Sequence, residues 1–124
     1  MKSRSTHVSV VDDDESVREA LPDLLRSFGA TVEAFASADE FLNSNALEIT
    51  QCMVLDIAMP GMTGPELRHE LVRRGRQIPT IFITAIKDDD VRTRLMRDGA
   101  VECLFKPFTD EDLHQALRLA GAAD

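Results

Sequence analysis

The hydrophobic pattern of this sequence alternates between two periods, and this alternation constrains its fold more than any other feature. Apolar runs at residues 7–11, 30–35, 52–55, 78–83 and 101–105 predict strands, and each is followed by apolar residues at helical spacing. Because the runs are continuously apolar, they predict a parallel sheet that is buried on both faces. Right-handed crossovers between such strands give a three-layer α/β sandwich around a five-stranded sheet.

The boundaries of the expected helices are marked by capping side chains, by acids that favour the positive end of a helix, by a proline that suits the first helical position and by glycines that tolerate a positive φ. These markers are Asp14 and Gly29 for the first helix, Ser37–Glu40 for the second, Pro65 for the third, Asp88–Asp90 and Gly99 for the fourth, and Thr109 for the fifth. The Ser37–Glu40 segment predicts a capping box, in which each side chain bonds the other residue's backbone N–H.

The chain has 124 residues, the size of one domain, and we expect residues 1–124 to form a single domain. No apolar run is long enough to span a bilayer, and the charged start Met1–Arg4 lacks the apolar segment of a signal peptide. Cys52 and Cys103 lie far apart in apolar runs, so we expect buried free thiols. These features predict a cytoplasmic protein.

Acidic residues outnumber basic ones, at 22 against 14, which gives a net charge of −8. A field of this sign repels nucleic acids and anionic lipids. We therefore expect this chain to bind neither nucleic acid nor a membrane by itself. The excess of carboxylates is instead compatible with a cation site.

Polar side chains gather at the carboxyl ends of the predicted strands, where ligands of such sheets bind. Asp12 and Asp13 follow the first strand, Asp56 the third, Thr84 the fourth and Lys106 the fifth. Three neighbouring carboxylates need a cation to stay ionised together, and oxygen ligands suit Mg²⁺, with Mn²⁺ as an alternative. A metal, a hydroxyl and a lysine beside a carboxylate meet the needs of phosphoryl transfer, in which the carboxylate can itself be the acceptor.

Other polar residues have structural explanations. Asp14 is expected to be only an N-cap, and Ser37 and Thr109 likewise. The three histidines form no ligand pair, and we expect His69 and His114 on the surface of their helices.

Four short motifs occur in order along the chain: Val10-Val11-Asp12-Asp13-Asp14, Leu55-Asp56-Ile57-Ala58-Met59-Pro60-Gly61-Met62-Thr63-Gly64, Ile83-Thr84-Ala85 and Phe105-Lys106-Pro107-Phe108. Together they resemble the receiver domain of two-component response regulators, most closely the FixJ-like subgroup. The resemblance extends from about residue 6 to residue 119. It implies a flavodoxin-like (βα)5 fold with the strand order 2-1-3-4-5.

The resemblance also implies a role for each matching residue. Asp56 would accept a phosphoryl group from a sensor histidine kinase, a histidine phosphotransfer protein or a small phosphodonor. The ligands of Mg²⁺ would be Asp12, Asp13, Asp56 and the backbone carbonyl of Ala58. The phosphoryl oxygens would be bound by Thr84 and Lys106 beside the small Ala85, with a cis peptide bond between Lys106 and Pro107.

Two features depart from the family pattern. Receivers usually carry an aromatic residue three positions before the lysine, where this chain has Cys103; we hypothesise that Phe105 partly replaces that ring. The residues that often orient the hydrolytic water correspond to Ala58 and Ile86, which cannot orient it. The sequence therefore predicts slow self-dephosphorylation.

The output of such a receiver is open at this stage. The chain either signals alone by docking or is the N-terminal regulatory part of a longer DNA-binding regulator. A homodimer through the fourth helix, fifth strand and fifth helix would pair Arg92, Arg94 and Arg97 with Glu102 and the acids 110–112, although a solvated charged face explains these residues equally well.

Two rival functions share this architecture. A flavodoxin-like cofactor binder needs a phosphate cradle where this chain has Asp12–Asp14. A phosphatase with an aspartyl nucleophile needs an acid where this chain has Ala58. We therefore expect a signalling domain and not an enzyme.

Overall fold

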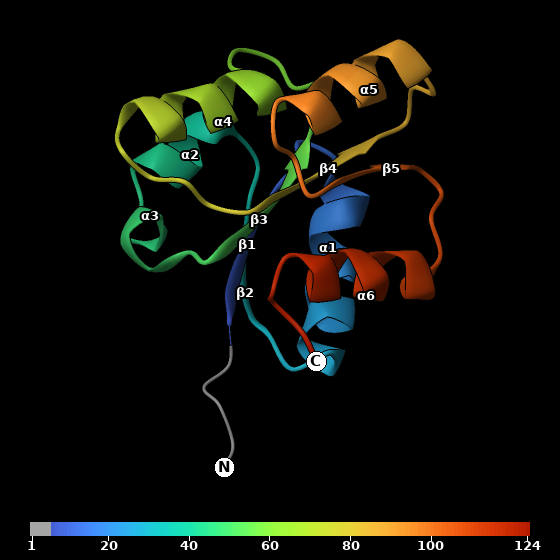
Figure 1. Ribbon diagram of the computed structural model, residues 1–124. Coiled ribbons are helices and arrows are strands. Elements are labelled where there is room, and N and C mark those ends of the chain that lie inside the picture. Colours follow the sequence, from blue (N-terminus) through green and yellow to red (C-terminus); the bar gives the residue numbers. More distant parts are fainter. Residues whose placement is uncertain (1–5) are drawn as a thin grey trace.

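The computed structural model describes residues 6–124, which form one parallel five-stranded sheet (Figure 1). The strands are β1 (His7–Val11), β2 (Thr31–Phe35), β3 (Cys52–Asp56), β4 (Thr80–Thr84) and β5 (Glu102–Phe105). Their order across the sheet is β2-β1-β3-β4-β5, which confirms the predicted topology. The segment Met1–Arg4, where a signal peptide was judged absent, lies outside the described residues.

Helices cover both faces of the sheet, as the predicted three-layer sandwich requires. Within residues 6–124 they are α1 (Glu15–Ser27), α2 (Ala38–Leu42), α3 (Ala46–Ile49), α4 (Gly64–Arg73), α5 (Asp89–Arg97) and α6 (Asp110–Leu119). Figure 1 shows α1 and α6 together on one face and α2, α3, α4 and α5 on the other. The short α3 was not predicted, because the polar segment 43–45 divides the expected second helix into two short ones.

Successive strand residues alternate between two cores, one on each face of the sheet. Every residue of β3 and β4 is buried, as their continuous apolar runs predicted. β2 differs, because it is an edge strand on which Glu33 and Ala34 stay exposed. The largest buried side chains on the α2–α5 side are Phe41, Met53, Leu55, Leu67, Leu71 and Phe82, and on the α1–α6 side Val8, Leu25, Ile81, Ile83, Leu113 and Leu117.

The predicted caps Asp14, Ser37 and Thr109 each accept a backbone N–H of their own helix. Asp88, at the predicted start of the helix α5, does the same. The prediction of a capping box at Ser37 is wrong for one of its two hydrogen bonds. The Glu40 carboxylate accepts the N–H of Ala36, at 3.3 Å, instead of the N–H of Ser37. A complete box lies at the start of α4, where Thr63 and Glu66 bond each other's backbone.

Three further expectations concern single side chains. Cys52 and Cys103 are free and buried, as predicted. His69 is exposed, but His114 is half-buried because its ring stacks on Phe28, with ring centroids 4.3 Å apart. No helix within residues 6–124 has the length and apolar character needed to cross a membrane.

Candidate functional site

The polar residues at the strand ends lie at one edge of the sheet. Asp56 and Thr84 are the last residues of β3 and β4, while Asp12 and Lys106 directly follow β1 and β5. These four strands are parallel neighbours, so their carboxyl ends point the same way. The structure thus brings together side chains from positions that are far apart in the sequence.

Three carboxylates form the centre of this edge. Asp12, Asp13 and Asp56 each contribute one oxygen to a set whose members all lie within 4.8 Å of one another. Asp12 is fully buried and Asp56 nearly so, whereas Asp13 is exposed. The cluster is therefore closed on the protein side and open to solvent beside Asp13.

Asp12 is held by four separate hydrogen bonds. Its Oδ1 accepts the N–H of Asp14 at 2.9 Å, and its Oδ2 accepts from Nζ of Lys106 at 3.0 Å. Its backbone N–H bonds the carbonyl of Phe35, and its backbone carbonyl accepts from the Arg18 guanidinium at 3.0 Å. Asp12 therefore has a fixed position, and the Lys106 ammonium compensates its buried charge.

Asp56 lacks such compensation. Burial, and then the charge of Asp12, raise the pKa of Asp56 from 3.8 to about 7, although Lys106 acts in the opposite direction. Either a proton or a cation must therefore neutralise this group near neutral pH. Three clustered carboxylates suit a hard divalent cation, which prefers oxygen ligands, so the donor set fits such an ion.

The raised pKa of Asp56 predicts an unusual pH dependence in metal-free buffer. Between pH 3.8 and about pH 7, the folded protein binds more protons at Asp56 than the unfolded chain does. The free energy of unfolding is therefore expected to fall as the pH rises through this window, by up to ~4 kcal/mol. Urea titrations of the protein and of its Asp56→Asn variant, taken as a difference, isolate this contribution.

The difference is needed because other carboxylates titrate in the opposite sense. Hydrogen bonds from Arg73 and Arg74 lower the pKa of Glu70 to about 2. In the pH range below the ordinary pKa of a glutamate, the contribution of Glu70 to the free energy of unfolding therefore rises as the pH rises. A difference between protein and variant that stays flat from pH 3.8 to 7 would contradict the assignment of this slope to Asp56.

The remaining predicted site residues surround the carboxylates. Thr84 is buried, and its Oγ1 accepts the N–H of Ile86 at 3.1 Å. Its backbone carbonyl accepts the N–H of Lys106 at 2.7 Å, which joins the ends of β4 and β5. Ala58 and Ala85 are exposed residues of the neighbouring loops. The Lys106–Pro107 peptide bond is cis, as the resemblance implied.

Phe105 is the residue that we hypothesised to replace the ring missing at Cys103. It is half-buried and packs against the same core as Cys103, on the α2–α5 side. The two side chains thus share a face of β5, and the replacement stays a hypothesis.

Two residues near the site were not singled out from the sequence. Arg18 contacts the Asp12 carbonyl from α1, and nothing in the local pattern distinguishes it from a solvated arginine. Gly64 begins α4 against β3: a Cβ there would overlap the carbonyl oxygen of Asp56 and lie 3.0 Å from its carbonyl carbon. A glycine directly before the helix-starting Pro65 was the signal for this close approach.

Replacing Gly64 by alanine is expected to lower the free energy of unfolding by ~3 kcal/mol, because backbone atoms would have to move. Urea unfolding measures the loss. Gly29→Ala is the control, since Gly29 has a φ of +98° but open space around its Cα. Its cost should be only ~1 kcal/mol. Equal costs for the two variants would contradict the close approach at Asp56.

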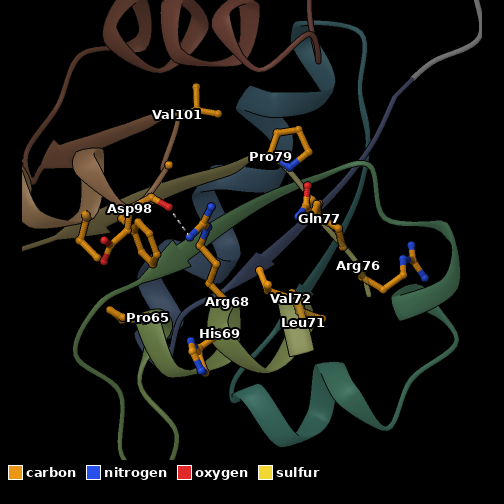
Figure 2. Close-up of a pocket in the computed structure, with 14 residues that line it drawn as sticks. Pro65, Arg68, His69, Leu71, Val72, Arg76, Gln77, Pro79, Asp98 and Val101 are labelled. Atoms are coloured by element: carbon orange, nitrogen blue, oxygen red, sulfur yellow. Dashed lines mark hydrogen bonds between the residues drawn. The ribbon is translucent and has the colours of Figure 1, made fainter. Parts of the chain in front are cut away.

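A separate groove of about 820 Å³ lies between α4 and α5, near the amino ends of β4 and β5 (Figure 2). Arg68 extends across it and donates a hydrogen bond to the backbone carbonyl of Asp98 at 3.1 Å. None of the predicted site residues lines this groove. The carboxylate cluster and the groove are therefore separate features of the structure.

Comparison with known proteins gives a consistent result. The family model of the response regulator receiver domain matches residues 8–118. Nodulation protein W of Bradyrhizobium diazoefficiens is 44% identical over 117 residues, which cover 94% of this chain and 52% of that protein. The transcriptional regulatory protein FixJ of Azorhizobium caulinodans is 40% identical over 114 residues, which cover 92% of this chain and 54% of that protein.

Among solved structures, the response regulator StyR is similar to this chain with a TM-score of 0.84 and 46% identity, over 94% of this chain and 59% of that one. The chain spans about half the length of the curated relatives it matches. The family match covers nearly all of the described residues, including every strand of the sheet except the first residue of β1. The chain therefore belongs to the response regulator receiver domain family.

Proposed function

We propose that this chain, residues 1–124 acting as one receiver unit, accepts a phosphoryl group on Asp56 in a two-component signalling system. The observation that supports this most directly is the carboxylate cluster, in which oxygens of Asp12, Asp13 and Asp56 lie within 4.8 Å of one another. Thr84 and Lys106 lie at the same edge of the sheet. In this reading the chain is a signalling domain and not an enzyme that turns over a substrate.

The proposed roles follow from the position of each group. Asp12, Asp13, Asp56 and the carbonyl of Ala58 would hold Mg²⁺, or Mn²⁺ in its place. Thr84 and Lys106 would bond oxygens of the phosphoryl group, and the small Ala85 would leave room for it. When bound, the divalent cation supplies positive charge that keeps Asp56 ionised and neutralises phosphoryl oxygens.

The transfer itself exchanges one bond for another. A carboxylate oxygen of Asp56 attacks phosphorus, and the bond between phosphorus and the donor atom breaks. The donor leaves with the electron pair: an imidazole nitrogen for a phosphohistidine, or an acetate oxygen for acetyl phosphate. Lys106 and Thr84 serve to position the phosphoryl oxygens, which is the main contribution a protein makes to such a transfer.

The proposed partner is a sensor histidine kinase or a histidine phosphotransfer protein in the cytoplasm. Because the matched relatives are about twice as long, we regard the chain as the regulatory part of a longer DNA-binding transcriptional regulator. With a net charge of −8, this part would leave DNA contact to another part of such a regulator. A homodimer through α5, β5 and α6 is the proposed output, with the qualification that Arg92 already pairs with Glu102 of its own chain.

Incubation with acetyl phosphate and Mg²⁺, followed by intact-mass measurement, tests the proposal. We expect a gain of about 80 Da, the mass of one phosphoryl group, that peptide mapping places on Asp56. Mn²⁺ should support the same gain, and chelation with EDTA should prevent it. A protein that gains no mass with either metal would overturn the proposed function.

The proposed phosphoaspartate is expected to decay slowly. Ala58 and the exposed Ile86 present no group that orients a water for attack on phosphorus. An Ala58→Asn or Ile86→Glu variant should therefore lose the added mass faster than the parent, by about tenfold. A decay time course by intact mass, begun after removal of acetyl phosphate, makes the comparison. Identical decay in all three proteins would contradict the prediction.

A further inference from the structure

The groove between α4 and α5 is lined mainly by apolar side chains (Figure 2). They include the buried Leu71, Ile78, Phe82 and Leu95 and the more exposed Val72. The volume of about 820 Å³ is typical of small-molecule sites, which combine an apolar lining with a few polar groups. The lining therefore suits a ligand with an apolar body.

The charge of this groove is opposite to the charge of the chain. Arg68 and Arg76 line it, and Asp98 is the one acidic residue of the lining within the described residues 6–124. The whole chain, in contrast, has a net charge of −8. A net positive groove in an acidic protein attracts anions and selects against cations.

The two arginines differ in how the protein holds them. Arg76 lies at one end of the groove, with Nη1 at 4.0 Å from a carboxylate oxygen of the exposed Glu48. Arg68 extends across the groove, is half-buried and forms no ion pair within residues 6–124. A half-buried charge without a counter-ion costs free energy that a bound anion would offset. Arg68 is therefore the group to which an anion gains most by binding.

The guanidinium of Arg68 is also short of hydrogen-bond acceptors. In the part of the chain that the structure describes, its one hydrogen bond runs from Nη1 to the backbone carbonyl of Asp98, at 3.1 Å. Nε is buried and has no partner there. A buried donor without an acceptor is uncommon in folded proteins because it has lost its hydrogen bonds to water. The site thus has an unused donor as well as an uncompensated charge.

Nε and Nη2 form the edge of the guanidinium that the Asp98 carbonyl does not occupy. Nη2 lies 3.1 Å from the position that a Cβ at Gly99 would take, so the missing side chain of Gly99 leaves this nitrogen uncovered on that side. Two parallel N–H groups on one edge of a guanidinium match the two oxygens of a carboxylate. A carboxylate that reaches Nη2 needs a small rotation of the Arg68 side chain to accept from Nε as well.

We propose that this groove binds a small monocarboxylate with an apolar body. The carboxylate accepts from Nε and Nη2 of Arg68, and the apolar body covers Leu71 and Val72 on α4. This site is additional to the proposed phosphoryl acceptor and does not depend on it, because no residue of the carboxylate cluster lines the groove.

The test uses hexanoate as the probe and hexanol as its uncharged counterpart of the same chain length. The chain lacks tryptophan and tyrosine, so amide NMR shifts of the isotope-labelled chain report binding at constant pH and ionic strength. We expect hexanoate to move the amide signals of Arg68, Val72 and Gly99 with a Kd of ~1 mM. Hexanol should bind about tenfold more weakly, because it lacks the charge-assisted hydrogen bonds.

Variants of Arg68 separate recognition of the carboxylate from support of the groove. Arg68→Gln should weaken hexanoate binding about tenfold, to the level of hexanol, and should leave hexanol binding unchanged. Arg68→Lys keeps the charge without the paired donors, so its hexanoate affinity should fall by about threefold. Arg94→Gln is the control, because Arg94 is an exposed residue of α5 outside the groove. It should match the parent with both probes.

Three results would overturn the proposal. The first is equal affinity of the parent for hexanoate and hexanol, and the second is a preference for hexanoate that persists in both Arg68→Gln and Arg68→Lys. A loss of hexanol binding in step with hexanoate would likewise assign Arg68 a purely structural role. The third is movement of the same amide signals with protein concentration alone, which would place a second copy of the chain in the groove.

Discussion

The Asp56→Asn variant is expected to gain no phosphoryl group from acetyl phosphate under conditions in which the parent gains about 80 Da. The amide of asparagine is a far weaker nucleophile than a carboxylate, and the other two acids are poorly placed to replace it. Asp12 is engaged by Lys106, and Asp13 is exposed to solvent. Intact-mass time courses should show a rate at least ~100-fold lower in the variant.

Asp14→Asn is the matched control for this substitution. Asp14 lies next to the cluster, but its side chain caps α1 by accepting the N–H of Ser16 at 2.9 Å. Asparagine caps helices about as well as aspartate, so this variant removes a neighbouring charge and keeps the fold. It should be phosphorylated at the parental rate. Mass gained by Asp56→Asn at the parental rate would exclude Asp56 as the main acceptor.

The convergence of the site residues could be predicted because it depends on topology alone. In a parallel sheet every strand ends at the same edge, so the residues at the strand ends must be neighbours. Asp12, Asp56, Thr84 and Lys106 needed only correct strand boundaries to be placed together. Their residue types, together with that of the adjacent Asp13, are three carboxylates, a hydroxyl and an ammonium, and this set indicated the chemistry.

The pairing within the site could not be predicted in the same way. Lys106 bonds Asp12, which is 94 residues away, and not the proposed acceptor Asp56. The choice between two adjacent carboxylates depends on rotamers and on differences of about one ångström, which a sequence pattern does not contain. The same limit applies to Arg18, whose contact with the Asp12 carbonyl depends on how α1 packs on the sheet.

The periphery of the fold shows a related limit. β2 was predicted to be buried on both faces like the other strands, but its position at the sheet edge leaves Glu33 and Ala34 exposed. His114 was expected on the surface, yet the packing of α6 against α1 brings it onto Phe28. Periodicity identifies which face of an element is apolar, whereas the neighbour of that face is decided by tertiary packing.

The Lys106→Ala variant is expected to be less stable than the parent by ~3 kcal/mol in metal-free buffer at about pH 8, because it leaves the buried Asp12 charge without a partner. Asp12 is fully buried, and its ion pair with Lys106 has a length of 3.0 Å. A divalent cation can replace the lost positive charge, so saturating Mg²⁺ should restore stability by more in the variant than in the parent. Urea unfolding with and without Mg²⁺ measures both effects.

Two comparison proteins define what this result would mean. Lys87→Ala removes an exposed lysine that makes no ion pair within the described residues 6–124, and its stability should stay within ~0.5 kcal/mol of the parent. Adding Asp12→Asn to Lys106→Ala removes the orphaned charge and should recover most of the lost stability without metal. If Lys106→Ala were as stable as Lys87→Ala, the ion pair with Asp12 would not be what compensates the buried carboxylate. Protonation of the cluster would then be what compensates the buried carboxylate, and Mg²⁺ would have less repulsion between the carboxylates to relieve.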